Sequence, residues 1–62
     1  METRFTDSQI AELRRLKEYF PYRVVFGALS PSGEFEANAQ TTKRRALKLA
    51  REGWHVEILT LG

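Results

Sequence analysis

Hydrophobic residues are most concentrated in the segment 22–29 (YRVVFGAL), which has the composition of a β-strand and is apolar on both of its alternating faces. As a strand, this segment points Val24, Phe26 and Ala28 to one side and Val25 and Leu29 to the other. A strand that is apolar on both faces needs cover on both, which favours a central position in a small sheet. We therefore expect the other elements to be arranged around it.

The segment before this strand predicts an α-helix over Asp7–Tyr19. Thr6 and Gln9 have the spacing of a capping box, in which each side chain accepts a hydrogen bond from the backbone amide of the other residue. Pro21 disfavours helical geometry at the residue before it and so ends the helix. Apolar residues recur between these limits at helical spacing, namely Ile10, Leu13, Leu16 and Phe20.

A hairpin and a second helix are expected after the central strand. Residues 30–33 (SPSG) have the order of a type I turn, and the alternation of acidic and apolar residues in 34–37 (EFEA) is typical of an edge strand. Residues 38–42 then lead into a helix, and Asn38, Thr41 and Thr42 are its alternative caps. Gly53 is placed to end the helix in a left-handed conformation. The residues expected on the apolar side of this helix are Ala39, Thr42, Ala46, Leu49 and Ala50.

Residues 54–61 (WHVEILTL) predict a third strand, with Val56 and Ile58 on one face. A right-handed crossover through the second helix brings this strand parallel to the second strand, with the most apolar strand between them. The sequence thus predicts one α+β domain over residues 1–62, in the order α-β-β-α-β, with a three-stranded antiparallel sheet of strand order 2-1-3. The second helix covers one face of the sheet, and the first helix leads in.

The other face of this sheet is expected to be partly apolar. Apolar cover there comes either from the first helix within the monomer or from a second copy of the chain, since exposed apolar patches usually mark contacts. We favour the first helix, and a homodimer is the alternative. The apolar residues of this face are Val25, Leu29, Leu59 and Leu61, and they are expected to share it with Arg23, Glu34, Glu36 and His55.

Composition limits the possible functions. A chain of 62 residues has a small core, and with no Cys and one His it has neither disulfides nor an ordinary set of metal ligands. We therefore expect no metal and no cofactor. No apolar run approaches the ~20 residues of a membrane span, so we expect a cytoplasmic protein without membrane contact. The net charge of +2 is too small to indicate nucleic acid by itself, so the placement of charge matters more.

Positive charge is concentrated in the second predicted helix, where five cations and no acid occur in nine residues: Lys43, Arg44, Arg45, Lys48 and Arg51. A solvated helix face accounts for the last two. Cations in the first turn oppose the helix dipole, however, at a cost of about 0.3–1 kcal/mol each. This conflict suggests an anion site, where free backbone amides, the hydroxyls of Thr41 and Thr42 and the nearby cations converge.

Two partners fit such a site. The phosphate backbone of DNA or RNA is one, with Arg44, Lys48 and Arg51 extending the contact along the helix. An acidic protein surface is the other. The alternative function is therefore a protein-interaction or inhibitor module that uses this helix or the apolar sheet face, and a solvated face without function is the third interpretation.

Catalysis has little support in the sequence. His55 has no Asp, Ser or Cys near it in sequence to form a triad, and we expect it to face solvent. Trp54 and Phe35 are better explained as core residues than as stacking platforms for bases. The sequence therefore predicts a binding module that is not an enzyme.

Overall fold

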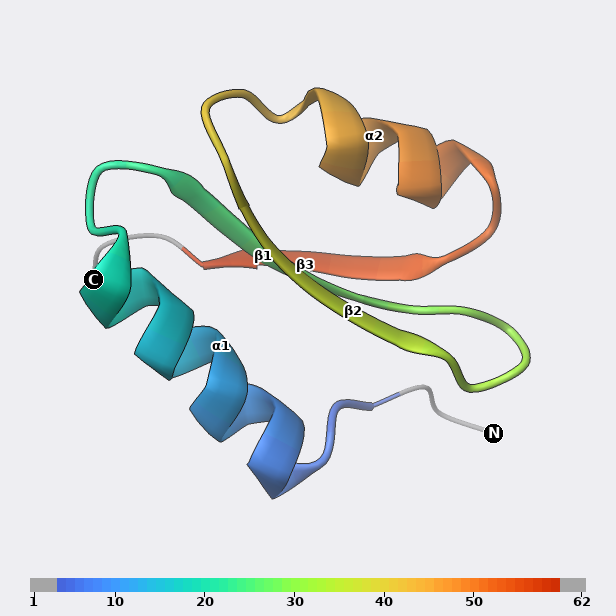
Figure 1. Ribbon diagram of the computed structural model, residues 1–62. Coiled ribbons are helices and arrows are strands. Elements are labelled where there is room, and N and C mark those ends of the chain that lie inside the picture. The colour runs from blue at the N-terminus through green and yellow to red at the C-terminus, as the bar shows by residue number, and fades with distance from the viewer. Residues whose placement is uncertain (1–3, 60–62) are drawn as a thin grey trace.

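The computed structural model describes residues 4–59, which form a three-stranded sheet with a helix on each face (Figure 1). The elements are α1 (Asp7–Tyr19), β1 (Val24–Leu29), β2 (Phe35–Gln40), α2 (Arg44–Arg51) and β3 (His55–Leu59). The strand order is β2-β1-β3, and β1 is antiparallel to both neighbours. The predicted fold class, element order and strand order are confirmed.

Helix α1 has the predicted bounds because its ends are set by local contacts. Thr6 Oγ1 accepts a hydrogen bond from the Gln9 amide at 3.2 Å, and the Thr6 amide donates to Gln9 Oε1 at 2.9 Å, which completes the capping box. After the helix, the Arg23 amide donates to the Phe20 carbonyl at 3.1 Å. This turn delays the start of β1 to Val24, two residues later than predicted.

Helix α1 covers the face of the sheet whose cover the sequence left open. Leu13 is 2% exposed and lies against Gly27, where a Cβ atom would come within 2.6 Å of Leu13 Cδ1. Val25 and Leu29 are buried beneath the helix. The monomer thus provides its own cover on this side, as we favoured, and the absence of a side chain at residue 27 is what allows the close approach.

Helix α2 covers the opposite face and lies mainly over β3 and β1, whereas α1 lies mainly over β2 and β1. The buried residues of this layer are Phe26, Ala28, Ala46 and Leu49, with Trp54, Val56 and Ile58 packed against them. The helix ends as predicted at Gly53, whose φ is 95°. The Trp54 amide then donates to the Leu49 carbonyl at 3.0 Å, and this bond directs the chain into β3.

The predicted start of the second helix is wrong. Residues 38–40 continue β2, with Asn38 opposite Phe26 and Gln40 opposite Val24. Backbone pairing with the long central strand therefore outweighs the capping tendency of Asn38, whose Oδ1 accepts a hydrogen bond from the Ala39 amide at 2.9 Å. Ala39 consequently belongs to β2 and not to the helix. Helix α2 begins only at Arg44.

The expected faces of the two acids in the hairpin are also wrong. The turn itself is confirmed, since the Gly33 amide donates to the Ser30 carbonyl at 3.0 Å with Gly33 at φ 96°. The turn length sets Phe35 opposite Leu29, so Phe35 lies on the α1 face and Glu36 on the α2 face. Glu34 is exposed in the connection before β2.

Candidate functional site

The start of α2 is poorly capped and fully open to solvent. Lys43 occupies the N-cap position with φ −84° and ψ 3°, and its side chain makes no capping hydrogen bond. The Arg44 amide donates to Thr42 Oγ1 at 3.3 Å, which is a long bond. All seven residues predicted for the anion site are exposed: Thr41, Thr42, Lys43, Arg44, Arg45, Lys48 and Arg51.

Three of these cations share the outward face of α2 with Leu47, and we call this face the basic stripe: Arg44, Leu47, Lys48 and Arg51. These four residues line a hollow of about 410 Å³. The stripe is opposite Ala46 and Leu49, which hold the helix on the sheet. Within residues 4–59, no carboxylate lies at ion-pairing distance from the three cations of the stripe. Their charge is therefore available to a partner.

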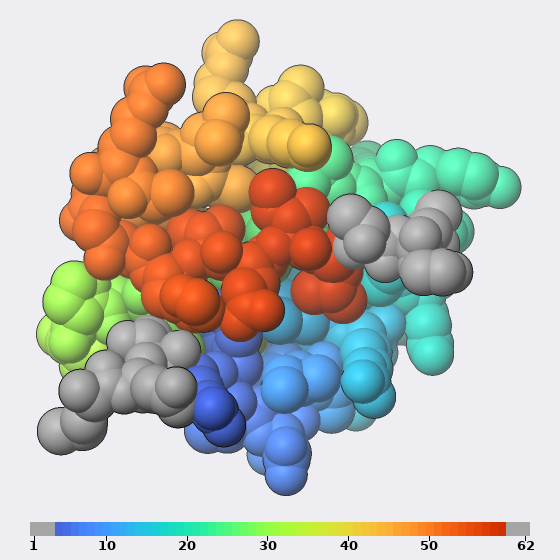
Figure 2. Space-filling view, turned by 180° about the vertical axis from the view of Figure 1, so that it is seen from behind, coloured from blue at the N-terminus to red at the C-terminus, as the bar shows by residue number. Residues whose placement is uncertain are grey.

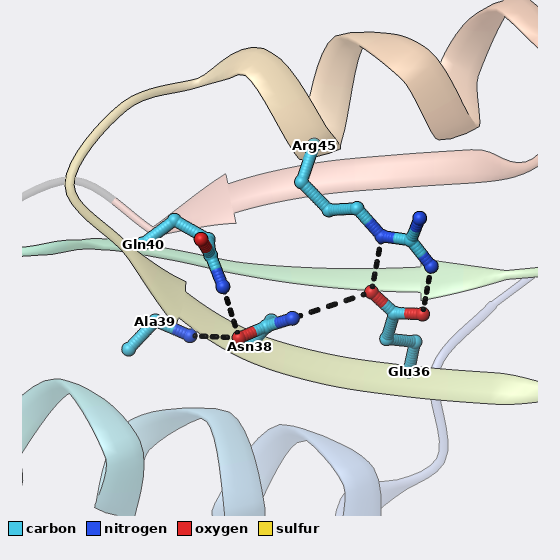
Figure 3. Close-up of polar contacts among 5 residues, drawn as sticks. All are labelled: Glu36, Asn38, Ala39, Gln40 and Arg45. Atoms are coloured by element: carbon cyan, nitrogen blue, oxygen red, sulfur yellow. Dashed lines mark hydrogen bonds and ion pairs between the residues drawn. The ribbon is translucent and has the colours of Figure 1, made fainter.

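Arg45 turns away from the stripe and binds the sheet (Figure 3). Its Nε and Nη2 atoms donate to the two carboxylate oxygens of Glu36 at 3.1 and 3.0 Å, which is the bidentate geometry of a strong pair. These hydrogen bonds hold the pKa of Glu36 below its usual value, and the Asn38 amide acts in the same direction, while partial burial opposes them. Glu36 raises the pKa of Arg45 in turn. Arg45 is thus a structural residue, and the predicted anion site is reduced by one cation.

The polar side chains of β2 extend this contact. Asn38 Nδ2 lies 3.5 Å from Glu36 Oε2, and Gln40 Nε2 donates to Asn38 Oδ1 at 2.7 Å. Helix α2 lies over β3 and β1, so this row of amides at the edge of the sheet is only partly covered. Sequence reasoning missed the row because it placed Asn38 and Gln40 outside the strand.

The residues expected for self-association are mostly inside the monomer. Val25 and Leu29 are buried under α1, and Leu59 is half-buried at the edge of the same layer. Leu61 is outside the described residues. A second copy could not reach Val25 or Leu29 without displacing α1.

The other candidate residues have ordinary surroundings. His55 is exposed on β3, where its Nε2 lies 3.0 Å from Glu57 Oε2 and its ring centroid 5.6 Å from that of Phe5. Phe35 makes an edge contact with Phe5, and Trp54 packs against the α2 layer, so both serve the core as predicted. Over residues 4–59, no cluster of three potential metal ligands occurs.

An aromatic segment was missed in the sequence because its members were assigned to a helix and a strand. Tyr19 is the last residue of α1, Phe20 and Tyr22 flank Pro21 in the connection between α1 and β1, and all three are exposed. Three aromatic residues within four positions were the signal available in the sequence.

Comparisons with protein-family models, with curated protein sequences and with solved structures gave no match for this chain. In the part of the chain that the structure describes, neither helix has the length and apolarity to span a membrane.

Proposed function

We propose that this protein is a binding module without catalytic activity, and that the basic stripe of α2 binds the phosphate backbone of nucleic acid. The observation that carries the proposal is the unpaired charge of this helix. Arg44, Lys48 and Arg51 are exposed on one face, and no acid of residues 4–59 neutralises them by direct pairing. The proposal places the protein in the cytoplasm, where such a partner is accessible.

The start of α2 supports the same proposal through its unfavourable electrostatics. Lys43 and Arg44 lie where the helix dipole disfavours cations, at a cost of about 0.3–1 kcal/mol each. Arg45 is offset by Glu36, whereas these two have no such compensation among the described residues. Local conflicts of this kind are expected where a surface serves a partner.

The geometry of the stripe suits a repeating anion. Arg44 and Arg51 are seven positions apart, which corresponds to about 10 Å along the helix axis. Lys48 lies between them on the same face, so successive phosphates along one strand could each meet a cation. Contacts of this type give affinity with little sequence preference.

A triple variant tests the proposal: Arg44, Lys48 and Arg51 all changed to Ala. Binding of the wild type to labelled duplex and single-stranded DNA, measured by fluorescence anisotropy, should weaken steeply with salt, with a log-log slope of roughly −2 to −3 for three phosphate contacts. The triple variant should lose at least about tenfold in affinity at low salt. Its circular dichroism should match the wild type, because none of the three side chains is buried.

The matched control is the double variant Arg14→Ala and Arg15→Ala on α1, which also removes exposed cations. It should retain most of the affinity. Equal losses per charge removed in the control and the triple variant would mean that only overall charge matters, and an unfolded triple variant would mean that the stripe is structural. Either result contradicts the proposal.

An acidic protein surface is the second candidate, and one observation favours it. Leu47 lies among the cations of the stripe and is 53% exposed, which is unusual for a pure phosphate contact. Leu47→Ser should weaken a protein complex markedly and change nucleic-acid binding little. Light scattering of the free protein would detect a homodimer.

A further inference from the structure

The end of α1 and the connection that follows it present exposed aromatic rings to solvent. Tyr22 is 99% exposed, Tyr19 is 76% exposed and Phe20 is 38% exposed. Single exposed apolar residues are common, but a cluster of aromatic rings marks a contact surface more often. Tyr22 in particular contributes almost no buried area to the monomer.

Cations from three separate segments surround this aromatic connection. The Arg23 guanidinium lies 5.1 Å from the centroid of the Phe20 ring. Lys17 Nζ donates to the Arg23 carbonyl at 3.0 Å, which holds the end of α1 against the turn. Lys17, Tyr22, Arg23 and Lys43 line one hollow of about 380 Å³, and no acidic residue is among the described residues that line it.

The topology joins this hollow to the basic stripe. Antiparallel pairing of Val24 with Gln40 and of Val25 with Leu59 brings the start of β1 and the ends of β2 and β3 to the same end of the sheet. The connection before β1 and the connection before α2 accordingly lie at that end (Figure 1). Seen from behind, the teal-green α1–β1 connection and the yellow start of α2 gather at the upper right (Figure 2). Lys43 belongs to the hollow and directly precedes Arg44 of the stripe.

We propose that this end of the sheet binds unpaired bases of single-stranded nucleic acid, with Tyr22 as a stacking platform and Lys17, Arg23 and Lys43 beside the adjoining phosphates. The inference rests on the proposed function, since the strand continues along the basic stripe. An exposed ring next to cations is the combination that single-stranded binders use. A base inside a duplex is already stacked between its neighbours and cannot use Tyr22, so the protein prefers a single strand.

Anisotropy titrations with a labelled oligothymidine and with a duplex of equal length test this inference. Tyr22→Ala should weaken binding to the single strand by roughly 5- to 100-fold. The same change should alter duplex binding by less than about twofold, because phosphate contacts remain. Tyr22→Phe keeps the ring and should bind the single strand like the wild type. Ile10→Ala is a control that should leave binding of the single strand unchanged, since Ile10 is a partly exposed apolar residue in the first turns of α1 and outside the hollow.

The outcomes separate this inference from the proposed function. If the triple stripe variant loses binding but Tyr22→Ala binds like the wild type, the stacking role of Tyr22 is overturned and the proposed function of the basic stripe is not. Equal losses in Tyr22→Ala and Tyr22→Phe also overturn it, because the hydroxyl and not the ring would then matter. If the wild type binds neither oligonucleotide at low salt, both proposals fail. Thermal melting of Tyr22→Ala should match the wild type, because the side chain is not buried.

Discussion

The two helices of this protein are stabilised in different ways. Helix α1 has 13 residues and a complete capping box, and its three acids and three bases balance: Asp7, Glu12, Glu18, Arg14, Arg15 and Lys17. Helix α2 has 8 residues, no side-chain cap at Lys43, and four cations with no acid. Isolated helices as short as α2 are marginal in water. The helical structure of α2 therefore depends on packing against the sheet. This packing also offsets the unfavourable electrostatic free energy of a charged outer face.

The packing of the two helices is nevertheless similar. Leu13 anchors α1 and Leu49 anchors α2, and each is 2% exposed. The helices lie on opposite faces of the sheet, and each contacts the central strand, with α1 displaced towards β2 and α2 towards β3. The two helices thus differ at their starts and on their outer faces, where local hydrogen bonds and charge determine how much each helix is stabilised.

The largest expected effect is the loss of either anchor. Leu13→Ala and Leu49→Ala should each lower the free energy of unfolding by about 2–5 kcal/mol, because both leave a cavity under a helix. A domain of this size rarely has more than about 3–5 kcal/mol in total, so either variant should be largely unfolded in urea titrations followed by circular dichroism. Leu47→Ala, two residues from Leu49 but exposed, should change stability by less than about 0.5 kcal/mol. A mild effect of Leu49→Ala would show that α2 contributes little to the fold.

The cap of α1 gives the next largest effect. Thr6→Ala removes one half of the capping box and should cost about 1 kcal/mol, or about 4–8 °C in Tm. Thr42→Ala should cost less, because Thr42 lies before the N-cap residue Lys43 and makes a single hydrogen bond without the reciprocal bond of a capping box. Similar losses in the two variants would contradict the view that only α1 has a start specified by its own side chains.

Charge reversal at the start of α2 should increase stability. Lys43→Glu places an anion at the positive end of the helix dipole and should raise the free energy of unfolding by about 0.3–1 kcal/mol. The same change should weaken binding of single-stranded DNA under the proposals above. Lys48→Glu, in the last turn, should instead lower stability because the dipole favours cations there. If Lys43→Glu raises the free energy of unfolding without weakening DNA binding, Lys43 is not part of the binding surface.

The smallest effect is expected for the pair that attaches α2 to β2. The pKa of Glu36 is below its unfolded value near 4.3, so the folded state binds fewer protons than the unfolded state as pH falls. The stabilisation is therefore complete above about pH 4.3 and is lost as pH falls through the lower folded pKa. It is small because Glu36 and Arg45 are 24% and 43% exposed. Urea titrations of the wild type and Glu36→Gln should differ at pH 7 and converge at low pH, while Glu34→Gln, which changes an exposed acid outside β2, should match the wild type at pH 7.

Several features of the fold followed directly from the sequence, because short-range chemistry decides them. Thr6, Gln9 and Pro21 set the ends of α1, and Gly33 and Gly53 allow the positive φ angles of two turns. Apolar residues on both faces of β1 indicated a central strand, and the right-handed crossover led to the observed strand order.

Only the tertiary structure decided how these elements meet. Pairing with β1 drew residues 38–40 into β2 against the capping tendency of Asn38, and the register of the hairpin moved Glu36 to the face of Arg45. The hollow that joins Tyr22 to Lys43 likewise depends on strands whose termini meet at one end of the sheet. The sequence by itself determined the type and order of the helices and strands, the bounds of α1 and the positions of the two glycine turns, since these depend mainly on neighbouring residues. The strand register, the face on which each side chain lies and the contacts between distant side chains depend on pairing between segments that are far apart in the sequence. A one-residue shift in pairing would move every side chain of a strand to the other face of the sheet.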